Sequence, residues 1–388
     1  MKIKDTCKRF SSGKNILATQ ISTNAKYPVF GGNGLRGYTD TYNFDGACAV
    51  IGRQGAYCGN VKFFSGKAYM TEHAVVAEPT EQHNARFLAY KLALMDLGKY
   101  AGQSAQPGLS VATIGDLDIN MPSLCEQNRI ANVLGSIEER IENNNAICAE
   151  LEAMAKLLYD YWFVQFDFPD ENGNPYKSSG GKMAWSEELK REIPEGWNAG
   201  NLYNIADFIN GLACQKFRPE VGGESLPVIK IGEMHDGITE KTERVRADIP
   251  QKNIIQDGDI LFSWSATLET MIWTGGVGGL NQHIFKVVPK LCSKHYVYQQ
   301  LSAYILNFVK MAEARKTTMG HITTDHLKQS KIALPPKNIV ALYEERVESI
   351  YSMVLTCRQE NRNLASLRDF LLPLLMNGQV GFKEVDCH

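Results

Sequence analysis

Two stretches of the chain carry apolar residues at alternating steps of four and three, which is the spacing of a helix that packs along one seam. Each seam lasts about four heptads and holds one Asn and one Cys near its middle. We predict two long helices that pack on each other, with the Asn residues fixing their register. The alternative is that each helix packs only on its own domain. The predicted seam comprises Ile130, Leu134, Ile137, Ile141, Asn144, Leu151 and Leu158, then Tyr343, Val347, Ile350, Val354, Asn361, Leu364 and Leu371.

The regions before each long helix show a different pattern, with short apolar runs bounded by turn residues and then a helical stretch. Strands are expected near Ala47–Gly52 and Asp259–Trp264, and helices near Ala85–Leu97 and Tyr296–Ala312. The fold class is therefore mixed α/β, with two α/β domains separated by two long antiparallel coiled-coil helices. The expected boundaries are 1–121 for lobe one, 122–165 for the central helix, 166–195 for a linker, 196–334 for lobe two, 335–378 for the C-terminal helix and 379–388 for a tail.

The two lobes carry an ordered set of sequence echoes, which indicates an internal duplication. Tyr27-Pro28-Val29-Phe30 is echoed by Leu226-Pro227-Val228-Ile229, and Thr71-Glu72-His73 by Asn281-Gln282-His283. An Asp-Gly turn enters an apolar strand at Asp45 and again at Asp257. The echoes keep the same order in both lobes, so we expect the lobes to share one plan.

Composition narrows the class of protein. The chain has 388 residues, of which 44% are hydrophobic and 22% charged, which suits several folded domains and excludes a disordered chain. The net charge is −2, but the positive excess lies in the two lobes and the negative excess in the helices and linker. That distribution favours two lobes that face a polyanion. The scattered cysteines form no Cys-x-x-Cys pair, and neither a signal peptide nor a membrane segment stands out, so we expect a cytoplasmic protein with free thiols.

The sequence contains no complete catalytic motif. The stretch 32–37 matches a dinucleotide fingerprint, but the residues that follow are turn-rich instead of helical, which favours a surface turn. No P-loop is present, and Asn174-Pro175-Tyr176 lacks the second proline of the amino-methylase tetrad. His321 and His326 stand five apart without a metal-site partner. We therefore expect neither catalytic residues nor a metal site in this chain.

The remaining candidates are polar residues in the turns of both lobes. Arg and Gln can make paired hydrogen bonds to base edges, whereas Lys mainly fixes phosphates. For any single residue, a solvated surface role is the alternative. The candidates for DNA binding are Arg36, Arg53, Gln54, Lys62, Gln103, Ser104 and Gln106 in lobe one, with Lys216, Arg218, Lys230, Lys241, Arg315, Lys316, Thr317 and His321 in lobe two.

Several segments resemble the specificity subunits of type I restriction-modification systems. The resemblance lies in the opening of the central helix, in the linker and in the ending, and it spans nearly the whole chain. The matching segments are Pro122–Ile130, Trp162–Pro169, Pro175–Gly181, Ile193–Trp197 and Leu374–Gly378. The second repeat departs from the family pattern, because Lys337–Val340 replaces the Glu-Gln segment that opens the first helix.

This resemblance implies two target-recognition domains, each of which reads one half of a bipartite site in double-stranded DNA. It implies that the helices set the gap between the halves and dock two methylase subunits, which bring S-adenosylmethionine. ATP and Mg²⁺ would serve restriction subunits in the full complex, and no cofactor is expected in this chain. Two alternatives stay open at this point: a methyltransferase or endonuclease that acts alone, and a scaffold that organises proteins without binding DNA.

Overall fold

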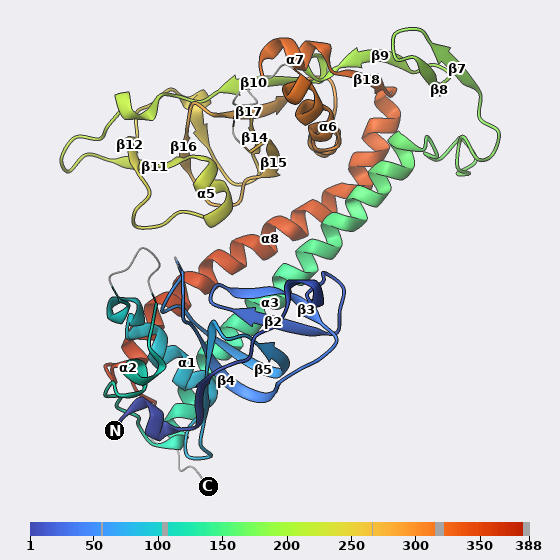
Figure 1. Ribbon diagram of the computed structural model, residues 1–388. Helices are drawn as coiled ribbons and strands as arrows, with labels where there is room; N and C mark the ends of the chain where they lie inside the picture. The colour runs from blue at the N-terminus through green and yellow to red at the C-terminus, as the bar shows by residue number, and fades with distance from the viewer. Residues whose placement is uncertain (56, 103–107, 266, 315–321, 383–388) are drawn as a thin grey trace. The chain divides into compact units, whose positions relative to one another are not determined.

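A computed structural model describes residues 1–55, 57–102, 108–265, 267–314 and 322–382 (Figure 1). The chain forms two compact units. The first unit comprises Met1–Ile141 with Leu364–His388, and the second comprises Glu142–Asn363. Each unit therefore contains one lobe together with parts of both long helices.

Lobe one is built on a single six-stranded sheet. Strand β6 is buried almost throughout, and so is β4 from Cys48 onward. Ala49 and Ile51 of β4 face one apolar core with helix α1, while Cys48 and Val50 face another. The strand order is β1 (Cys7–Ser12), β6 (Ala74–Pro79), β4 (Phe44–Gly52), β5 (Val61–Met70), β2 (Tyr27–Gly31) and β3 (Gly34–Thr39).

Helix α1 (Ala85–Leu94) covers this sheet and begins where the Asn84 side chain accepts a hydrogen bond from the Phe87 amide at 2.9 Å. It ends three residues earlier than the pattern predicts, and a separate short turn follows. The shorter helical segments of lobe one are Ile3–Thr6, Ala18–Gln20, Leu97–Tyr100 and α2 (Val111–Gly115).

Lobe two carries two four-stranded sheets instead of one larger sheet. The first has the order β10 (Ala206–Asn210), β17 (Ile284–Pro289), β14 (Ile260–Ser263) and β15 (Glu269–Ile272). The second has the order β12 (Arg244–Arg246), β11 (Ser225–Ile229), β16 (Gly278–Leu280) and β13 (Ile254–Ile255). The strand pair β9 (Asn198–Asn201) and β18 (Lys331–Leu334) opens and closes the lobe, and its helical segments are α4 (Leu202–Ile205), Cys214–Lys216, α5 (Ile231–Asp236), Gln251–Asn253, α6 (Lys294–Ala314) and α7 (Thr324–Gln329).

The long helices are α3 (Leu124–Tyr159) and α8 (Lys337–Met376). The side chain of Ser123 caps the start of α3 by accepting from the Glu126 amide at 3.3 Å. A π turn, Asp160–Val164, continues α3, and α8 ends before Gly378, whose φ of +67° suits glycine.

The seams of the two helices face each other in both units. In the first unit, Ile130 and Leu134 pack with Leu375 and the half-buried Leu371. In the second unit, the Asn144 side chain donates to Oδ1 of Asn361 at 2.9 Å. The alternative in which each helix packs only on its own domain is therefore wrong. Every predicted seam position is buried or half-buried.

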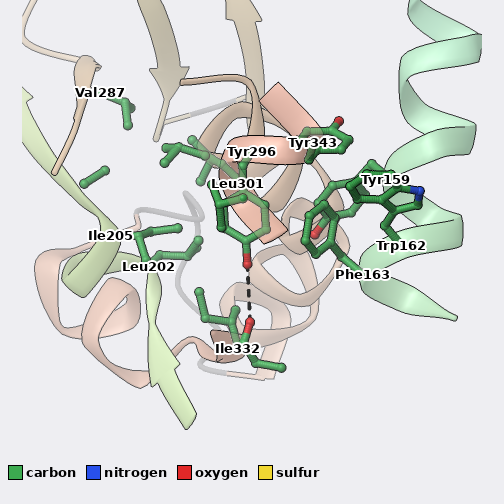
Figure 2. Close-up of a cluster of buried hydrophobic side chains, with 14 of the residues drawn as sticks. Tyr159, Trp162, Phe163, Leu202, Ile205, Val287, Tyr296, Leu301, Ile332 and Tyr343 are labelled. Atoms are coloured by element: carbon green, nitrogen blue, oxygen red, sulfur yellow. Dashed lines mark hydrogen bonds between the residues drawn. The ribbon is translucent and has the colours of Figure 1, made fainter. Parts of the chain in front are cut away.

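An aromatic cluster joins α3, α6 and α8 within the second unit (Figure 2). The π turn directs Trp162 and Phe163 into this cluster, where Phe163 meets the rings of Tyr296 and Tyr343 edge-on at 4.8 and 5.0 Å between ring centroids. Tyr296 is completely buried, and its hydroxyl donates to the carbonyl of Ala333 at 3.3 Å. Lobe two is thus rooted on the helix pair by apolar packing.

The linker is ordered by its own contacts. Asp167 is buried and accepts hydrogen bonds from the amide and the hydroxyl of Ser178, at 2.7 and 2.6 Å. Phe168 stacks between Tyr176 and Trp197, and the hairpin of β7 (Met183–Ser186) and β8 (Arg191–Pro194) follows. The predicted linker is therefore a folded element of the second unit.

Candidate functional site

In lobe one, a junction forms where strand β4 ends. The amide of Arg53 donates to the carbonyl of His73 at 2.9 Å, and the carbonyl of Arg53 accepts from the amide of Leu109 at 2.9 Å. The Gly102 amide donates to the Gly108 carbonyl at 3.1 Å, which closes the base of the loop between them. Strand end, histidine turn and loop therefore meet at one place.

Lobe two builds the same junction from different side chains. The amide of Trp264 donates to the carbonyl of His283 at 3.3 Å, and the carbonyl of Trp264 accepts from the amide of Ile322 at 3.0 Å. The turns match as well, because the His73 amide donates to the Thr71 hydroxyl at 3.3 Å and the His283 amide to the Asn281 side chain at 3.4 Å. The duplication seen in the sequence therefore extends to individual backbone hydrogen bonds.

A glycine-rich hairpin turn packs against the junction of lobe one. The turn joins β2 to β3, and residues 34–37 already lie on β3, so the stretch 32–37 is followed by no helix and is not a dinucleotide site. A Cβ added to Gly52 would meet the Gly32 carbonyl oxygen at 2.2 Å, and one added to Gly32 would meet the Gln54 carbonyl oxygen at 2.8 Å. Glycine is required on both sides of this contact.

Three of the predicted DNA-binding residues of lobe one gather around this turn. Arg36 follows it on β3, Gln54 passes beneath it, and Lys62 lies beside Gly34, with Nζ 3.3 Å from the position that a Cβ would take. All three are exposed. A pocket of about 130 Å³ opens here between the turn, Tyr57 and Asn60, and among the described residues that line it only Lys62 is charged.

Arg53 is placed differently from these three. Its guanidinium donates to the Leu109 carbonyl at 3.1 Å and to the Ser12 hydroxyl at 3.4 Å, so it holds the junction together. The sequence could not reveal this, because both partners come from distant segments.

In lobe two the described cations are partly neutralised. Lys230 pairs with Glu243 at 2.7 Å, and the hydrogen bond from Lys230 lowers the pKa of Glu243, with a further contribution from the charge of Arg218. Lys216, Arg218 and Lys241 are exposed. Lys230 is therefore engaged within the lobe.

Two exposed arginines of lobe two were missed by the sequence analysis. Arg244 and Arg246 flank the buried Val245 on strand β12, so both face the same side. The alternation of Arg, Val and Arg is typical of a strand with one buried face, and this pattern could have indicated that both arginines are exposed. Arg246 also pairs with Asp248 at 2.8 Å.

Seven predicted residues lie outside the described part of the chain. They are Gln103, Ser104, Gln106, Arg315, Lys316, Thr317 and His321. The ends of their two loops are nevertheless fixed at equivalent places, by Leu109 at Arg53 and by Ile322 at Trp264. No group of three His, Cys, Asp or Glu side chains suited to a metal ion occurs within the described residues.

The duplicated α/β lobe is that of a known family. The family model for the type I restriction modification DNA specificity domain matches residues 1–153 and again residues 194–346. Since the two matches together cover most of the chain, this protein belongs to that family. The predicted membership of this family is thereby confirmed.

Individual relatives agree with the family. A Haemophilus influenzae protein, the type I restriction enzyme HindI specificity subunit, is 24% identical over 327 residues, which is 71% of each chain. The Escherichia coli EcoprrI specificity subunit is 45% identical over 112 residues, which is 29% of this chain and 28% of its own length. The crystal structure of an S subunit from M. genitalium covers all of this chain and 96% of its own, with a TM-score of 0.62 and 16% identity, and so shares the fold.

Within the described residues, no helix is both long and apolar enough to cross a membrane.

Proposed function

We propose that each lobe recognises one half of a two-part sequence in double-stranded DNA and that α3 and α8 set the length of the gap between the halves. The observation that carries this proposal is the junction built twice, with the same backbone hydrogen bonds at Arg53 and at Trp264. Each junction joins a strand end to a histidine turn and to the end of one loop, at Leu109 or Ile322. Because the side chains around the two junctions differ, the two lobes would read different bases.

The residues around the hairpin turn of lobe one suit contact with duplex DNA. Arg36 and Gln54 are exposed and can form paired hydrogen bonds with base edges, and Lys62 can neutralise a phosphate. Arg244 and Arg246 are exposed guanidinium groups on lobe two, each held on one side by a neighbour, Ser225 for Arg244 and Asp248 for Arg246. The Arg53 guanidinium holds Leu109 and Ser12, so its replacement would act on DNA binding indirectly.

The long helices offer two matching apolar surfaces for partner subunits. On α3, Met154 and Leu157 are 58% and 68% exposed; 213 positions later, on α8, Leu367 and Phe370 are 45% and 65% exposed. Exposed apolar side chains on a polar helix surface are typical of protein interfaces. We infer that each pair docks one methylase subunit. S-adenosylmethionine would enter with the methylases, and ATP and Mg²⁺ with restriction subunits.

The docking surfaces can be tested by counting subunits. Leu157→Glu should remove one methylase from a two-methylase assembly, and Phe370→Glu should remove the other. Ser349→Glu adds the same charge at an exposed position of α8 outside both pairs and serves as the control. The assembly is measured by native mass spectrometry. Retention of both methylases by the Leu157→Glu, Phe370→Glu double variant would overturn this assignment.

The function itself is tested by mapping methylated bases in host DNA with and without this gene. The proposal predicts a two-part motif that appears only when the gene is present with its methylase partners. Methylation by the purified chain with S-adenosylmethionine alone would instead favour a methyltransferase that acts by itself. Assembly with methylases but no gene-dependent motif would favour a scaffold.

A further inference from the structure

One strand of lobe two is interrupted where lobe one has a continuous strand. In lobe one, β5 pairs with β4 along most of its length and with β2 at its end, so it holds a single sheet together. In lobe two, β15 ends at Ile272 and β16 begins at Gly278, and these strands belong to different sheets. The buried Trp273 fills the break, and its indole donates to the Gly276 carbonyl at 2.6 Å.

Helix α8 holds this break through a cluster of polar contacts. Arg362 donates to both carboxylate oxygens of Asp257 at 3.2 Å and to the carbonyl of Thr274 at 2.8 Å. Gln359, on the same face of the helix, donates to Asp257 at 2.9 Å. The amide of Gly276 donates to the same carboxylate at 2.6 Å. Two helix side chains thus tie the turn before β14 to the break before β16.

The carboxylate of Asp257 is mostly buried and is stabilised in its charged form by its hydrogen-bond donors. Its side chain is 17% exposed. Burial by itself would raise the pKa of the carboxyl group, but the hydrogen bonds from Arg362, Gln359 and the Gly276 amide outweigh burial and lower its pKa below the usual 3.8. Paired hydrogen bonds between arginine and a carboxylate also fix direction, because the guanidinium is planar.

Lobe two consequently has two attachments to α8. The first is the aromatic root, where His295 pairs with Glu344 at 2.9 Å and stacks on Tyr351. The second is the contact at Arg362, which lies 11 residues beyond Tyr351 along the helix, or about 16 Å. If the lobe pivoted on the root alone, a rotation of about 12° would move it at Arg362 by about 3.4 Å, the rise of one base pair.

The positions of α3 that correspond to Gln359 and Arg362 carry no polar side chains. Counting back 213 positions from Gln359 and Arg362 gives Ala146 and Ala149, whose side chains have no polar groups. Asp45, which echoes Asp257 in the sequence, lies 3.7 Å from Lys67 within its own sheet. The contact therefore accompanies the strand break and is not a general feature of the repeat.

We propose that Asp257, Gln359 and Arg362 form a clamp that fixes the angle of lobe two on α8 and thereby the gap length at which its half-site is accepted. This inference rests on the proposed function. The three residues are positioning residues, since the clamp joins the lobe to the helix. Removing the clamp leaves the root and both junctions intact, so the bases read should stay the same while the accepted gap loosens.

The test maps methylated motifs in hosts that carry the full chain with its methylase partners. In Gln359→Ala, Arg362→Ala, sites whose gap is one base pair longer or shorter should gain methylation at least tenfold, with both half-sites unchanged. Asp257→Asn keeps the size of the side chain and should give the same relaxation. Arg362→Lys retains the charge with fewer donors and should relax the gap less.

The matched control is Arg346→Ala, which removes an exposed arginine from the same helix away from the clamp and should keep the gap strict. If the wild-type protein yields no two-part motif, the proposed function fails. If the wild-type motif is two-part and Asp257→Asn keeps its gap strict, the clamp proposal fails while the proposed function stands. Altered half-site bases in the clamp variants would also overturn the clamp.

Discussion

The two lobes follow one plan but differ in how they are held together. Lobe one has one sheet because β5 is unbroken, and its helix α1 contacts α3 where Tyr90 donates to Glu138 at 2.6 Å. Lobe two has a broken strand, two sheets and a second attachment at Arg362. In lobe two, the contact from helix α8 therefore lies at the place where lobe one has a continuous strand.

The largest effect is expected from a charge placed in the helix seam of each unit. Leu134 and Val347 occupy corresponding seam positions, 213 apart, and both are fully buried. Replacement of either by Asp leaves an unpaired charge in the seam and should cost about 3–5 kcal/mol of unfolding free energy. Urea denaturation measures the loss. Tolerance of Asp at only one position would show that the seams of the two units are not equivalent.

A second test concerns the polar layers at the middle of the helix pair. Repeat one has Asn144 followed by Cys148, and repeat two has Cys357 followed by Asn361, so the antiparallel helices can match Asn with Asn. Cys357 lies close enough to add to the raised pKa of Cys148, which is mainly due to burial. Asn therefore lies opposite Asn in one layer of the seam, and Cys lies near Cys in the next.

Exchanging Asn and Cys in repeat one alone should break this match. Asn144→Cys, Cys148→Asn leaves buried amides facing thiols and should cost about 1–3 kcal/mol for each unsatisfied group. Adding Cys357→Asn, Asn361→Cys restores like with like and should recover most of the loss. The midpoint of thermal unfolding measures both steps. Equal stability of the double and quadruple variants would show that the layers do not specify pairing.

The smallest expected effect concerns one glycine in each lobe. A Cβ on Gly13 would meet the Met70 carbonyl oxygen at 2.0 Å, and one on Gly211 would meet the Asn281 carbonyl oxygen at 2.0 Å. Replacement by Ala should destabilise each lobe by about 1–3 kcal/mol, because the strand must move. The free energies of unfolding of the two single variants, measured by urea denaturation, check this prediction. An effect confined to one lobe would limit the structural equivalence of the repeats.

The sequence was sufficient to predict the helices and the plan of the lobes. Heptad spacing placed Asn144 and Asn361 in the seams, since periodicity reports directly which face of a helix is buried. The echo of His73 by His283 likewise anticipated the repeated junction. These features depend on local patterns that one sequence displays. Of the two predicted Asp-Gly turns, only the one at Asp257 forms, because Asp45 and Gly46 lie within strand β4.

Other features depend on contacts between distant segments and could not be predicted. The engagement of Arg53 requires the carbonyl of Leu109, and the neutralisation of Lys230 requires Glu243 from the adjacent strand region. Arg362 binds at the strand break near Trp273. In the sequence, this break reads like an ordinary loop, because both are rich in turn residues. Charge and residue type were enough to select Arg53 and Lys230 as candidates. Their partners are known only from the fold.

The central claim is that the lobes read bases while the helices set the gap. Inserting a copy of Glu138–Asn144 after Asn144 and a copy of Arg358–Leu364 after Cys357 adds one heptad to each helix. The new layers pair Ile with Leu and Asn with Asn, and the copied Gln359 and Arg362 keep the clamp at Asp257. The spacer grows by seven residues, or about 10 Å, which corresponds to about three base pairs.

The most direct measurement is the methylated motif of a host that carries this lengthened chain with its methylase partners. Three base pairs also rotate one half-site by roughly 100°, so the extent of methylation should fall as the DNA or the helices twist to follow. The account predicts the same two half-sites separated by a longer gap. Methylation at the original gap with full efficiency, or half-sites with altered bases, would contradict it.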